Sequence, residues 1–460
     1  MKNLIKYKLL VLATIVCHNI SAYDFTVDGI HYTILSKEKH TCEVSDDGTR
    51  YYSKPSSYKG DIVIPSTVFY NNKNYTVTTI GNCAFLGASK VTSVSIPNTV
   101  DSIAERSFSY SGITHLTISS NIKVIAEEAF EFCSSLQSID VSTGYFTIGK
   151  HAFFGCFNLS SIKVDIGNKA YDSRNNCNAI IESSTNKLIL GCKNTIIPND
   201  VETIGYGAFA YCTGLTSINI PNSVTSIEST AFSWCKNLKT LLIPRSVKSI
   251  GGYCPFFECI SLDQIVVDKE NPYFDSRDNC NAILETATNE LVLGCKSTII
   301  PQTTNKIGDW AFGGCTGLTE IVIPYGVKEI GSSSFNCMDN LTKVTIPASV
   351  TTIGNNAFES NKNMESIYNY STIPQEISPN FCRDTRVTIH VPKGYKDIYT
   401  KTSYWHLFEI VDDLILSTAI NNVCINNNVD KNKYKKIWMN NKLIIKNKFN
   451  SYEVNGIHIY

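Results

Sequence analysis

The sequence predicts a repeat solenoid, in which short strands from successive coils of the chain stack into a parallel β-sheet. The block from Ile204 to Pro221 is matched, residue class for residue class, by the block from Ile227 to Pro244, at an offset of 227 − 204 = 23. A fixed period of roughly 20 to 50 residues is typical of repeat arrays, whose blocks bury their apolar faces only against neighbouring blocks. Each block contains the segment Leu-x-x-Ile-x-Ile-Pro, and its period of two indicates a short strand.

Composition excludes several classes of function. The formal net charge is zero, from 41 basic and 41 acidic residues, so no overall field attracts nucleic acid or an anionic membrane. No stretch after the N-terminal segment is long and apolar enough for a transmembrane helix.

Residues 1–22 have the features of a secretory signal peptide. A lysine-containing start is followed by a short apolar run that ends at Cys17, and the small pair Ser21-Ala22 suits cleavage. Cys17 raises the alternative of a lipoprotein, but Val16 before it is bulkier than a lipobox usually accepts. We therefore expect soluble export.

The segment 23–75 is expected to form a β-rich N-terminal cap. Asp28-Gly29 and Asp47-Gly48 are hairpin-turn signals. The end of a repeat array must present a polar outer face, which such a segment can supply.

Residues 76–370 hold about ten repeats, each starting at an isoleucine. Most steps are 22 or 23 residues, and two are longer: 204 − 148 = 56 and 307 − 250 = 57. The anchors are Ile80, Ile103, Ile125, Ile148, Ile204, Ile227, Ile250, Ile307, Ile330 and Ile353.

Phenylalanine and cysteine recur in fixed slots of the repeat. A large ring beside a small residue fills an interior layer, and cysteine is among the most buried residue types, so both slots are expected to face inward. Met338 and Asn361 hold the cysteine slot late in the array, which favours packing over obligatory disulfides. The predicted core ladder comprises Phe130, Phe153, Phe209, Phe232 and Phe312, with Cys133, Cys156, Cys212, Cys235 and Cys315.

The two long steps are insertions near 166–198 and 269–301. They are near copies at an offset of 275 − 172 = 103, and in each two apolar runs flank a Ser/Thr/Asn turn, which predicts a β-hairpin. Folding about residues 184 and 185 places Cys177 opposite Cys192, and folding about 287 and 288 places Cys280 opposite Cys295. These pairs are disulfide candidates, and two neighbouring free thiols are the alternative.

Each insertion also carries a cluster of oxygen-bearing side chains around Asp172 or Asp275. A calcium loop would need alternating carboxylates and a terminal Glu, which both clusters lack. Asp, Ser and Asn are also what a tight turn requires, and we favour that interpretation.

The repeat rhythm fades after residue 370. Residues 371–411 end in a bulky apolar cluster that includes Trp405 and are expected to form a C-terminal cap. Residues 412–460 are rich in Asn and Lys and form a separate tail.

The repeat Ile-Gly-x-x-Ala-Phe-x-x-Cys-x-x-Leu-x-x-Ile-x-Ile-Pro resembles the BspA-like (treponemal-type) leucine-rich repeat, over roughly residues 60 to 370. The Asp-Ser-Arg-x-Asn-Cys-Asn-Ala insertions and the cap from Val391 to Trp405 are similar to features of Bacteroidetes members. The resemblance implies a curved leucine-rich repeat array in an exported or cell-surface protein that adheres to proteins of a host or of neighbouring cells. The ending Tyr452 to Ile459 is similar to the last strands of a secretion-sorting domain, here shortened.

No catalytic or metal-ligating motif accompanies the array. The eight histidines fall in no repeating slot and in no zinc spacing, and no phosphate-binding or nucleophile motif is present. We therefore expect a non-catalytic protein without a cofactor that binds partner proteins, with a glycan-binding surface module as the alternative. The candidate contact residues, whose alternative role is packing between neighbouring loops, are Tyr211, Trp234, Leu242, Val266 and Val322.

Overall fold

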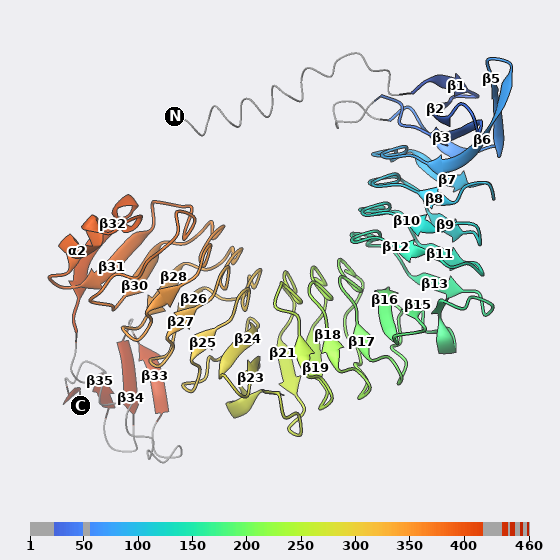
Figure 1. Ribbon diagram of the computed structural model, residues 1–460. Helices are drawn as coiled ribbons and strands as arrows, with labels where there is room; N and C mark the ends of the chain where they lie inside the picture. Colours follow the sequence, from blue (N-terminus) through green and yellow to red (C-terminus); the bar gives the residue numbers. More distant parts are fainter. Residues whose placement is uncertain are drawn as a thin grey trace. The chain divides into compact units, whose positions relative to one another are not determined.

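The computed structural model describes residues 23–48 and 56–416, together with the backbone of four short strands in the segment 435–459. The predicted signal peptide, residues 1–22, lies outside the described residues. The chain divides into two compact units, Met1–Leu262 and Asp263–Tyr460, which we call the N-terminal and C-terminal units. Each unit is a parallel β-solenoid with little helix (Figure 1). No helix within the described residues has the length and apolar character needed to cross a bilayer.

The N-terminal unit begins with hairpins that lead into the first coil. β1 and β2 meet at a turn where Asp28 and Gly29 both have positive φ, as a tight hairpin requires. β3 then pairs in parallel with β6, which continues into the coils. The strands are β1 (Phe25–Val27), β2 (Ile30–Ser36), β3 (Thr41–Val44), β4 (Gly60–Val63), β5 (Thr67–Tyr70) and β6 (Lys73–Ile80).

Most of the following coils contribute strands to two parallel ladders, but the segment 215–221, which was expected to be a strand, forms none. The isoleucine anchors pair in register from one coil to the next, as Ile80 with Ile103 and Ile103 with Ile125. The Leu-x-x-Ile-x-Ile segments form a second ladder, in which Leu116 pairs with Ile139. These strands are β7 (Val91–Ser95), β8 (Ser102–Ile103), β9 (His115–Ile118), β10 (Val124–Ile125), β11 (Ser138–Val141), β12 (Thr147–Ile148), β13 (Ser161–Val164), β17 (Thr203–Ile204), β18 (Ser226–Ile227), β19 (Thr240–Ile243) and β20 (Ser249–Ile250).

The insertion in the N-terminal unit is a hairpin whose second strand joins the solenoid. β14 (Tyr171–Asp172), a 3-10 turn (Arg174–Asn176), β15 (Ala179–Glu182) and β16 (Lys187–Gly191) follow one another, and β16 pairs in parallel with β17. The Gly191 N–H donates to the Ala208 carbonyl, as the Phe209 N–H donates to Ala231 one coil later. A Cβ on Gly191 would lie 2.2 Å from the Phe209 ring, so glycine stands where other coils carry phenylalanine.

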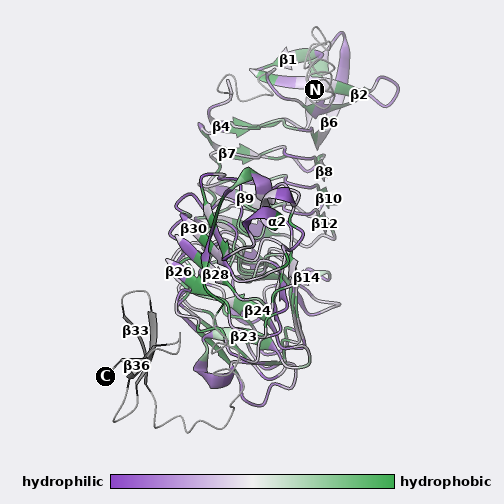
Figure 2. Cartoon of the chain, turned by 90° about the vertical axis from the view of Figure 1, so that its left-hand side faces the viewer, coloured by the Kyte–Doolittle hydropathy of each residue, from purple (hydrophilic) through white to green (hydrophobic). Residues whose placement is uncertain are grey.

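The C-terminal unit repeats this plan and ends on a short helix. The hairpin of this unit, which is the second in the chain, joins the solenoid through β24. β24 pairs with β25, and β25 pairs with β27. The strands β26, β28, β30, β31 and β32 form a five-stranded parallel sheet. The helix α2 (Lys396–Lys401) carries buried Tyr399, and buried Trp405 donates its Nε1–H to the Gln375 carbonyl at 2.8 Å. Figure 2 shows hydrophobic colouring along strands such as β23 and β24 and hydrophilic colouring on α2. The elements are β21 (Gln264–Val267), β22 (Phe274–Asp275), a 3-10 turn (Arg277–Asn279), β23 (Ala282–Glu285), β24 (Glu290–Gly294), β25 (Lys306–Ile307), β26 (Glu320–Val322), β27 (Glu329–Ile330), β28 (Lys343–Ile346), β29 (Thr352–Ile353), β30 (Ser366–Asn369), β31 (Thr388–Pro392), a 3-10 turn (Trp405–Leu407) and β32 (Glu409–Leu414).

The tail segment 435–459 contains four antiparallel strands, described here only by their backbone. They are β33 (Lys435–Met439), β34 (Lys442–Lys446), β35 (Ser451–Glu453) and β36 (His458–Ile459).

The core of the coils is a column of stacked phenylalanine rings beside a row of cysteine side chains. Phe130 stacks on Phe153 at 5.2 Å, and Phe209 stacks on Phe232 at 5.1 Å. Phe312 stacks on Phe335 at 5.3 Å in the C-terminal unit. Buried side chains of the predicted ladder are Phe130, Phe153, Phe209, Phe232, Phe312, Cys133, Cys156, Cys212 and Cys235, while Cys315 is half-buried against the same core.

The cysteine thiols do more than fill space. The Cys133 Sγ lies 3.0 Å from the Phe108 carbonyl oxygen, and the Cys259 Sγ lies 3.2 Å from that of Phe232, so each thiol can donate to a main-chain oxygen of the preceding coil. Asn361, in the same slot, donates its side-chain N–H to the Phe335 carbonyl at 2.8 Å. In these coils the slot holds a small donor, so an amide can replace the thiol, whereas Met338 occupies the same slot without a donor.

Candidate functional site

Four aromatic side chains of the N-terminal unit stand at a backbone position that suits glycine. The second residue after each core phenylalanine, from Phe85 to Phe358, has positive φ. For a residue other than glycine this conformation costs roughly 1 kcal/mol. We call Tyr110, Phe132, Tyr211 and Trp234 the aromatic row. The whole series is Gly87, Tyr110, Phe132, Gly155, Tyr211, Trp234, Glu258, Gly314, Cys337 and Ser360.

The rings of the aromatic row touch one another in sequence. Tyr110 stacks on Phe132 at 4.9 Å, and Phe132 meets Tyr211 edge to face at 5.4 Å. Tyr211 stacks on Trp234 at 5.0 Å, with the two rings 5° from parallel. A Cβ on Gly155 would lie 2.4 Å from the Phe132 ring. Gly155 therefore leaves room for the Phe132 ring. Phe132 in turn contacts both Tyr110 and Tyr211, which are far apart in the sequence.

Neighbouring loops cover much of the row. Phe154 and Phe157 meet Tyr211 edge to face at 4.7 and 5.4 Å, and Phe257 meets Trp234 in the same way at 5.6 Å. Tyr211 and Trp234 are accordingly half-buried, whereas Tyr110 at one end is 41% exposed. Burial, together with nearby Tyr110 and acidic side chains, raises the pKa of Tyr211 to about 12, so its hydroxyl remains neutral.

Charged groups border the aromatic row. The Lys236 Nζ lies 4.6 Å from the Trp234 ring centroid and 3.9 Å from a Glu258 carboxylate oxygen. Near Phe132, the half-buried Glu131 has a raised pKa because of burial and the neighbouring Glu128 charge. Aromatic rings within a polar rim are typical of protein–protein contact surfaces.

The other candidate contact residues do not join this row. Leu242 is exposed on β19 of the N-terminal unit, and Val266 and Val322 are exposed on β21 and β26 of the C-terminal unit. All three point outward from strands, whereas the aromatic row lies in the turns. As binding residues they remain predictions.

The hairpin cysteines are free thiols, as in the alternative to the disulfides, and the register expected across the hairpin differs from the structure by one residue. A bulge between Ile180 and Ile181 shifts the register, so Ala179 pairs with Gly191. The Cys192 Sγ then lies 3.5 Å from the Asn178 carbonyl oxygen instead of facing Cys177. A one-residue slip sends a strand side chain to the opposite face. The same bulge recurs in the second hairpin, and Cys177, Cys192, Cys280 and Cys295 are all buried and unpaired with another sulfur.

The oxygen-rich clusters of the hairpins serve as turn braces. Arg174 binds Asp172 through two N–H groups, at 2.7 and 2.6 Å, and also contacts Asn186 and Asp200. Burial alone would raise the pKa of Asp172, but hydrogen bonds from Arg174 and Ser183 outweigh it and lower the pKa. With its carboxylate occupied by a guanidinium, the Asp172 cluster fits the turn interpretation.

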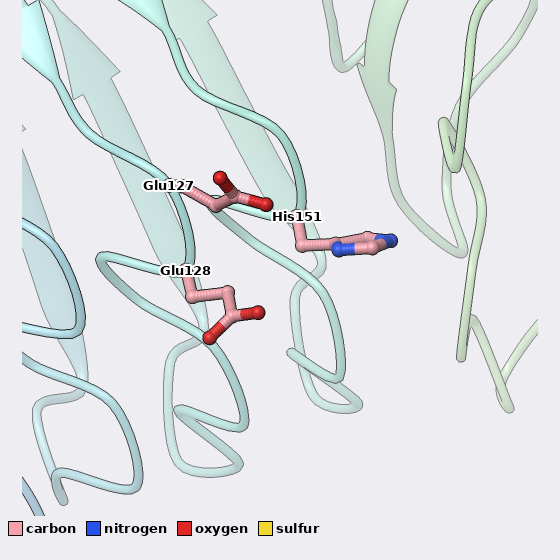
Figure 3. A group of neighbouring side chains, drawn as sticks. All are labelled: Glu127, Glu128 and His151. Atoms are coloured by element: carbon pink, nitrogen blue, oxygen red, sulfur yellow. The ribbon is translucent and has the colours of Figure 1, made fainter.

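Glu127, Glu128 and His151 form a group that has the side-chain types of a metal site (Figure 3). Their nearest ligand atoms lie within 4.8 Å of one another. The Glu128 carboxylate, however, accepts a hydrogen bond from Arg106. The Tyr206 hydroxyl lies 2.7 Å from the His151 Nε2, and burial and the adjacent Lys150 lower the pKa of His151. These contacts form a network that balances charge within the coils, and we assign no metal to it.

A serine, a histidine and an aspartate meet on the outward face of the sheet β9–β11–β13, which the sequence did not indicate. The His115 Nδ1 lies 2.7 Å from the Ser138 Oγ, and the His115 Nε2 lies 3.6 Å from Asp140. A serine nucleophile also needs donors that bind an oxyanion, most often main-chain N–H groups. β11 is paired on both edges, so its main-chain N–H groups are committed to the sheet. The trio therefore lacks the rest of a hydrolase site.

Most of the chain matches the model of one protein family. The model described as BspA type leucine rich repeat region (6 copies) matches residues 63–181, 179–290 and 291–406. No curated protein matches the chain.

The chain is also similar to solved structures of bacterial repeat proteins. A leucine rich cell surface protein from Faecalibacterium prausnitzii is 22% identical, with 85% of this chain and 86% of that chain covered and a TM-score of 0.36. The pneumococcal vaccine antigen PcpA is 16% identical, with 86% and 100% covered and a TM-score of 0.41. A leucine-rich repeat protein from Bacteroides ovatus is 22% identical, with 75% and 94% covered and a TM-score of 0.35.

Proposed function

We propose that this chain, which belongs to the BspA-type leucine-rich repeat family, is an exported or cell-surface protein that binds partner proteins and catalyses no reaction. The aromatic row is the surface that we assign to this contact. Family membership supports protein binding in general, and the residues of the row make the proposal specific to this chain. Adhesion to proteins of a host or of neighbouring cells is the setting that best suits an exported binder.

The observation that carries the proposal is the placement of large rings where the backbone favours glycine. Gly87 and Gly155 show that other coils of the same unit use glycine at this position. Tyr110 and Trp234 accept the cost of positive φ, as Glu258, Cys337 and Ser360 do in the same slot, and only the aromatic row adds large rings there. Tyrosine and tryptophan are also the residues most enriched where binding energy is concentrated.

Binding can be tested without disturbing the backbone, because glycine is native to the position. The full-length mature protein and its Tyr110→Gly and Trp234→Gly variants are measured by biolayer interferometry against a panel of purified extracellular-matrix proteins. Tyr253→Ala, which removes a 59% exposed tyrosine elsewhere in the same unit, is the matched control. We expect at least one matrix protein to bind, with a loss of about tenfold or more in the glycine variants, since ring anchors contribute about 2 kcal/mol or more each. Equal binding by all four proteins would rule out the row as the contact.

Export is tested separately on cells of the organism that produces the protein. Protease treatment of intact cells, followed by immunoblotting, is expected to degrade the chain while a cytosolic marker survives. Recovery of the whole protein in the protease-protected fraction would contradict surface exposure, and its recovery in culture medium would support release from the cell.

The alternative role for Tyr211 and Trp234, as platforms for a glycan, is disfavoured by their geometry. A sugar stacks on the open face of an aromatic ring. Tyr211 and Trp234 cover each other at 5.0 Å, and Lys236 lies over the Trp234 ring. Both contacts use ring surface that a sugar would need, so we keep the protein-binding role for this row.

A further inference from the structure

A groove of about 490 Å³ lies beside the first hairpin of the N-terminal unit, away from the aromatic row. One wall is the turn before β12, with Thr143 and Tyr145, and the other is the hairpin, with Glu182 and Ser184. Lys169 lies in the segment that joins them. This volume is within the range of about 300 to 1,000 Å³ that is usual for small-molecule sites.

A buried asparagine joins the turn before β12 to the start of the hairpin at Tyr171. The Asn168 side-chain N–H groups donate to the Ser142 and Gly144 carbonyls at 2.7 and 2.9 Å. Its Oδ1 accepts from the main-chain N–H groups of Ala170 and Tyr171, at 3.0 and 2.9 Å. Because these main-chain groups are already paired, a ligand in the groove meets side chains and not a free strand edge. A preformed site loses little free energy to ordering when it binds.

The lining of the groove includes a buried tyrosine, Tyr171. The Tyr171 hydroxyl donates to the Phe146 carbonyl at 2.7 Å. Burial raises the pKa of Tyr171 to about 12, with further contributions from Glu182 and Tyr145, which face it. Tyr145 itself is 72% exposed, so its ring stands at the rim as a large apolar surface open to solvent.

The side chains of the groove combine one open ring with hydrogen-bonding groups of both kinds. Thr143 and Ser184 offer hydroxyl groups, Glu182 offers acceptors, and Lys169 offers donors. The one positive and one negative charge give the lining no net charge. A pyranose ring presents C–H groups on its faces and hydroxyl groups at its edges, so it matches a ring platform flanked by polar side chains. A positively charged ligand would be repelled by Lys169, and a negatively charged ligand would be repelled by Glu182.

We propose that this groove binds a short neutral oligosaccharide, with one sugar ring stacked on Tyr145 and its hydroxyl groups bonded to Glu182, Lys169, Thr143 and Ser184. The site is independent of the aromatic row and extends the proposed function, since a protein that binds partners outside the cell through one surface would meet glycans at another.

The test uses the full-length mature protein and isothermal titration calorimetry with neutral di- to tetrasaccharides of glucose, galactose, mannose and N-acetylglucosamine. Sugar concentrations reach about 10 mM, because a site that stacks a single sugar ring is expected to bind weakly, with a Kd of about 1 mM. We expect binding of at least one sugar, about tenfold weaker in Tyr145→Ala and several-fold weaker in the isosteric Glu182→Gln. Thermal unfolding of each variant checks its fold, which exposed substitutions rarely disturb.

Control variants separate this site from the proposed function. Tyr253→Ala and Trp234→Gly are expected to bind the sugar as the unchanged protein does. The proposal is overturned if no neutral sugar binds, if Tyr145→Ala binds with unchanged affinity, or if only sulfated or sialylated glycans bind. If the aromatic-row variants lose protein binding but still bind the sugar, the aromatic row and the groove are two separate binding surfaces.

Discussion

The Cys235 thiol lies 3.1 Å from the main-chain oxygen of Phe209, one coil earlier in the chain. The same oxygen already accepts the Cys212 N–H at 2.9 Å, so the thiol occupies its second lone pair. If the slot required only a small apolar residue, valine would serve as well as cysteine. If the hydrogen bond contributes to stability, serine, which is shorter but keeps a donor, should be a more stable replacement than valine.

Replacement of Cys235 distinguishes these roles. We expect Cys235→Ser to be more stable than Cys235→Ala and Cys235→Val by about 0.5–1.5 kcal/mol, the net contribution of a buried hydrogen bond. Urea unfolding followed by circular dichroism provides the comparison. An alanine or valine variant at least as stable as the serine variant would show that only packing matters in this slot.

The buried thiols predict a loss of stability in alkali. Burial raises the pKa of Cys133 from 9.0 to about 12, and it also raises the pKa of Cys212 and Cys259 to about 12. The unfolded chain releases these protons above pH 9, whereas the folded chain holds them until about pH 12, so rising pH favours unfolding. The stabilisation is complete below pH 9 and is lost as pH rises through this window.

The measurement is the urea midpoint between about pH 8 and about pH 11, where each such group contributes up to about 1.4 kcal/mol per pH unit. Cys133→Ser, which has no thiol to titrate at this position, is expected to reduce the slope. A midpoint that is constant over this range, or equal slopes in both proteins, would contradict the assignment.

Arg174 predicts a strong difference between arginine and lysine in the first hairpin. Its guanidinium, 22% exposed, binds Asp172 through two groups and also reaches Asn186 and Asp200. Lysine keeps the charge but cannot form the fork, so Arg174→Lys is expected to lower stability by about 1–3 kcal/mol. Faster proteolysis within the turn of the hairpin is the local measurement.

Arg386 supplies the matched control for this change. It forms a similar two-group contact with Asp384, but its side chain is 86% exposed. Exposed ion pairs are screened by water, so Arg386→Lys should leave the unfolding midpoint unchanged. Equal effects at the two sites would mean that the fork geometry in the hairpin contributes nothing.

Gly191 predicts a steric effect inside the solenoid. A Cβ at this position would lie 2.2 Å from the Phe209 ring, so Gly191→Ala is expected to cost about 1–3 kcal/mol through overpacking. A Cβ on Gly252 would meet no atom within 4 Å, so Gly252→Ala should be neutral or slightly stabilising. Thermal unfolding of the two variants tests this, and a similar loss in both would indicate a backbone effect and not a clash.

The coils could be predicted from the sequence because individual residues mark the period of the repeat. Apart from the two insertions, the isoleucine slot recurs at 22 or 23 residues and the phenylalanine slot at 22 to 24 residues. The ladder of isoleucine anchors, formed by two-residue strands such as those at Ile103 and Ile125, was not expected, because a strand that short has no period of its own.

Two features of the candidate sites depend on backbone detail that spacing does not reveal. The bulge at Ile180 and Ile181 changes the register by one residue, which is enough to separate Cys177 from Cys192. The positive φ at Tyr110 and Trp234 is visible in hindsight, because Gly87 and Gly155 hold the same slot in other coils. That glycine alternation was the available signal for the aromatic row. The groove at Tyr145 joins segments that the sequence keeps apart.

Gly191 divides the phenylalanine column of the N-terminal unit into separate runs, and Gly294 begins the column of the C-terminal unit, because each stands where another coil carries a ring. The runs extend from Phe85 to Phe153, from Phe209 to Phe256 and from Phe312 to Phe358. A loosened ring disturbs its neighbours within a run but meets no ring beyond the glycine. In a repeat protein, whose cooperativity passes from neighbour to neighbour, such breaks let one section fray while the next stays intact. The hairpin of each unit thus supplies a point at which local melting can stop.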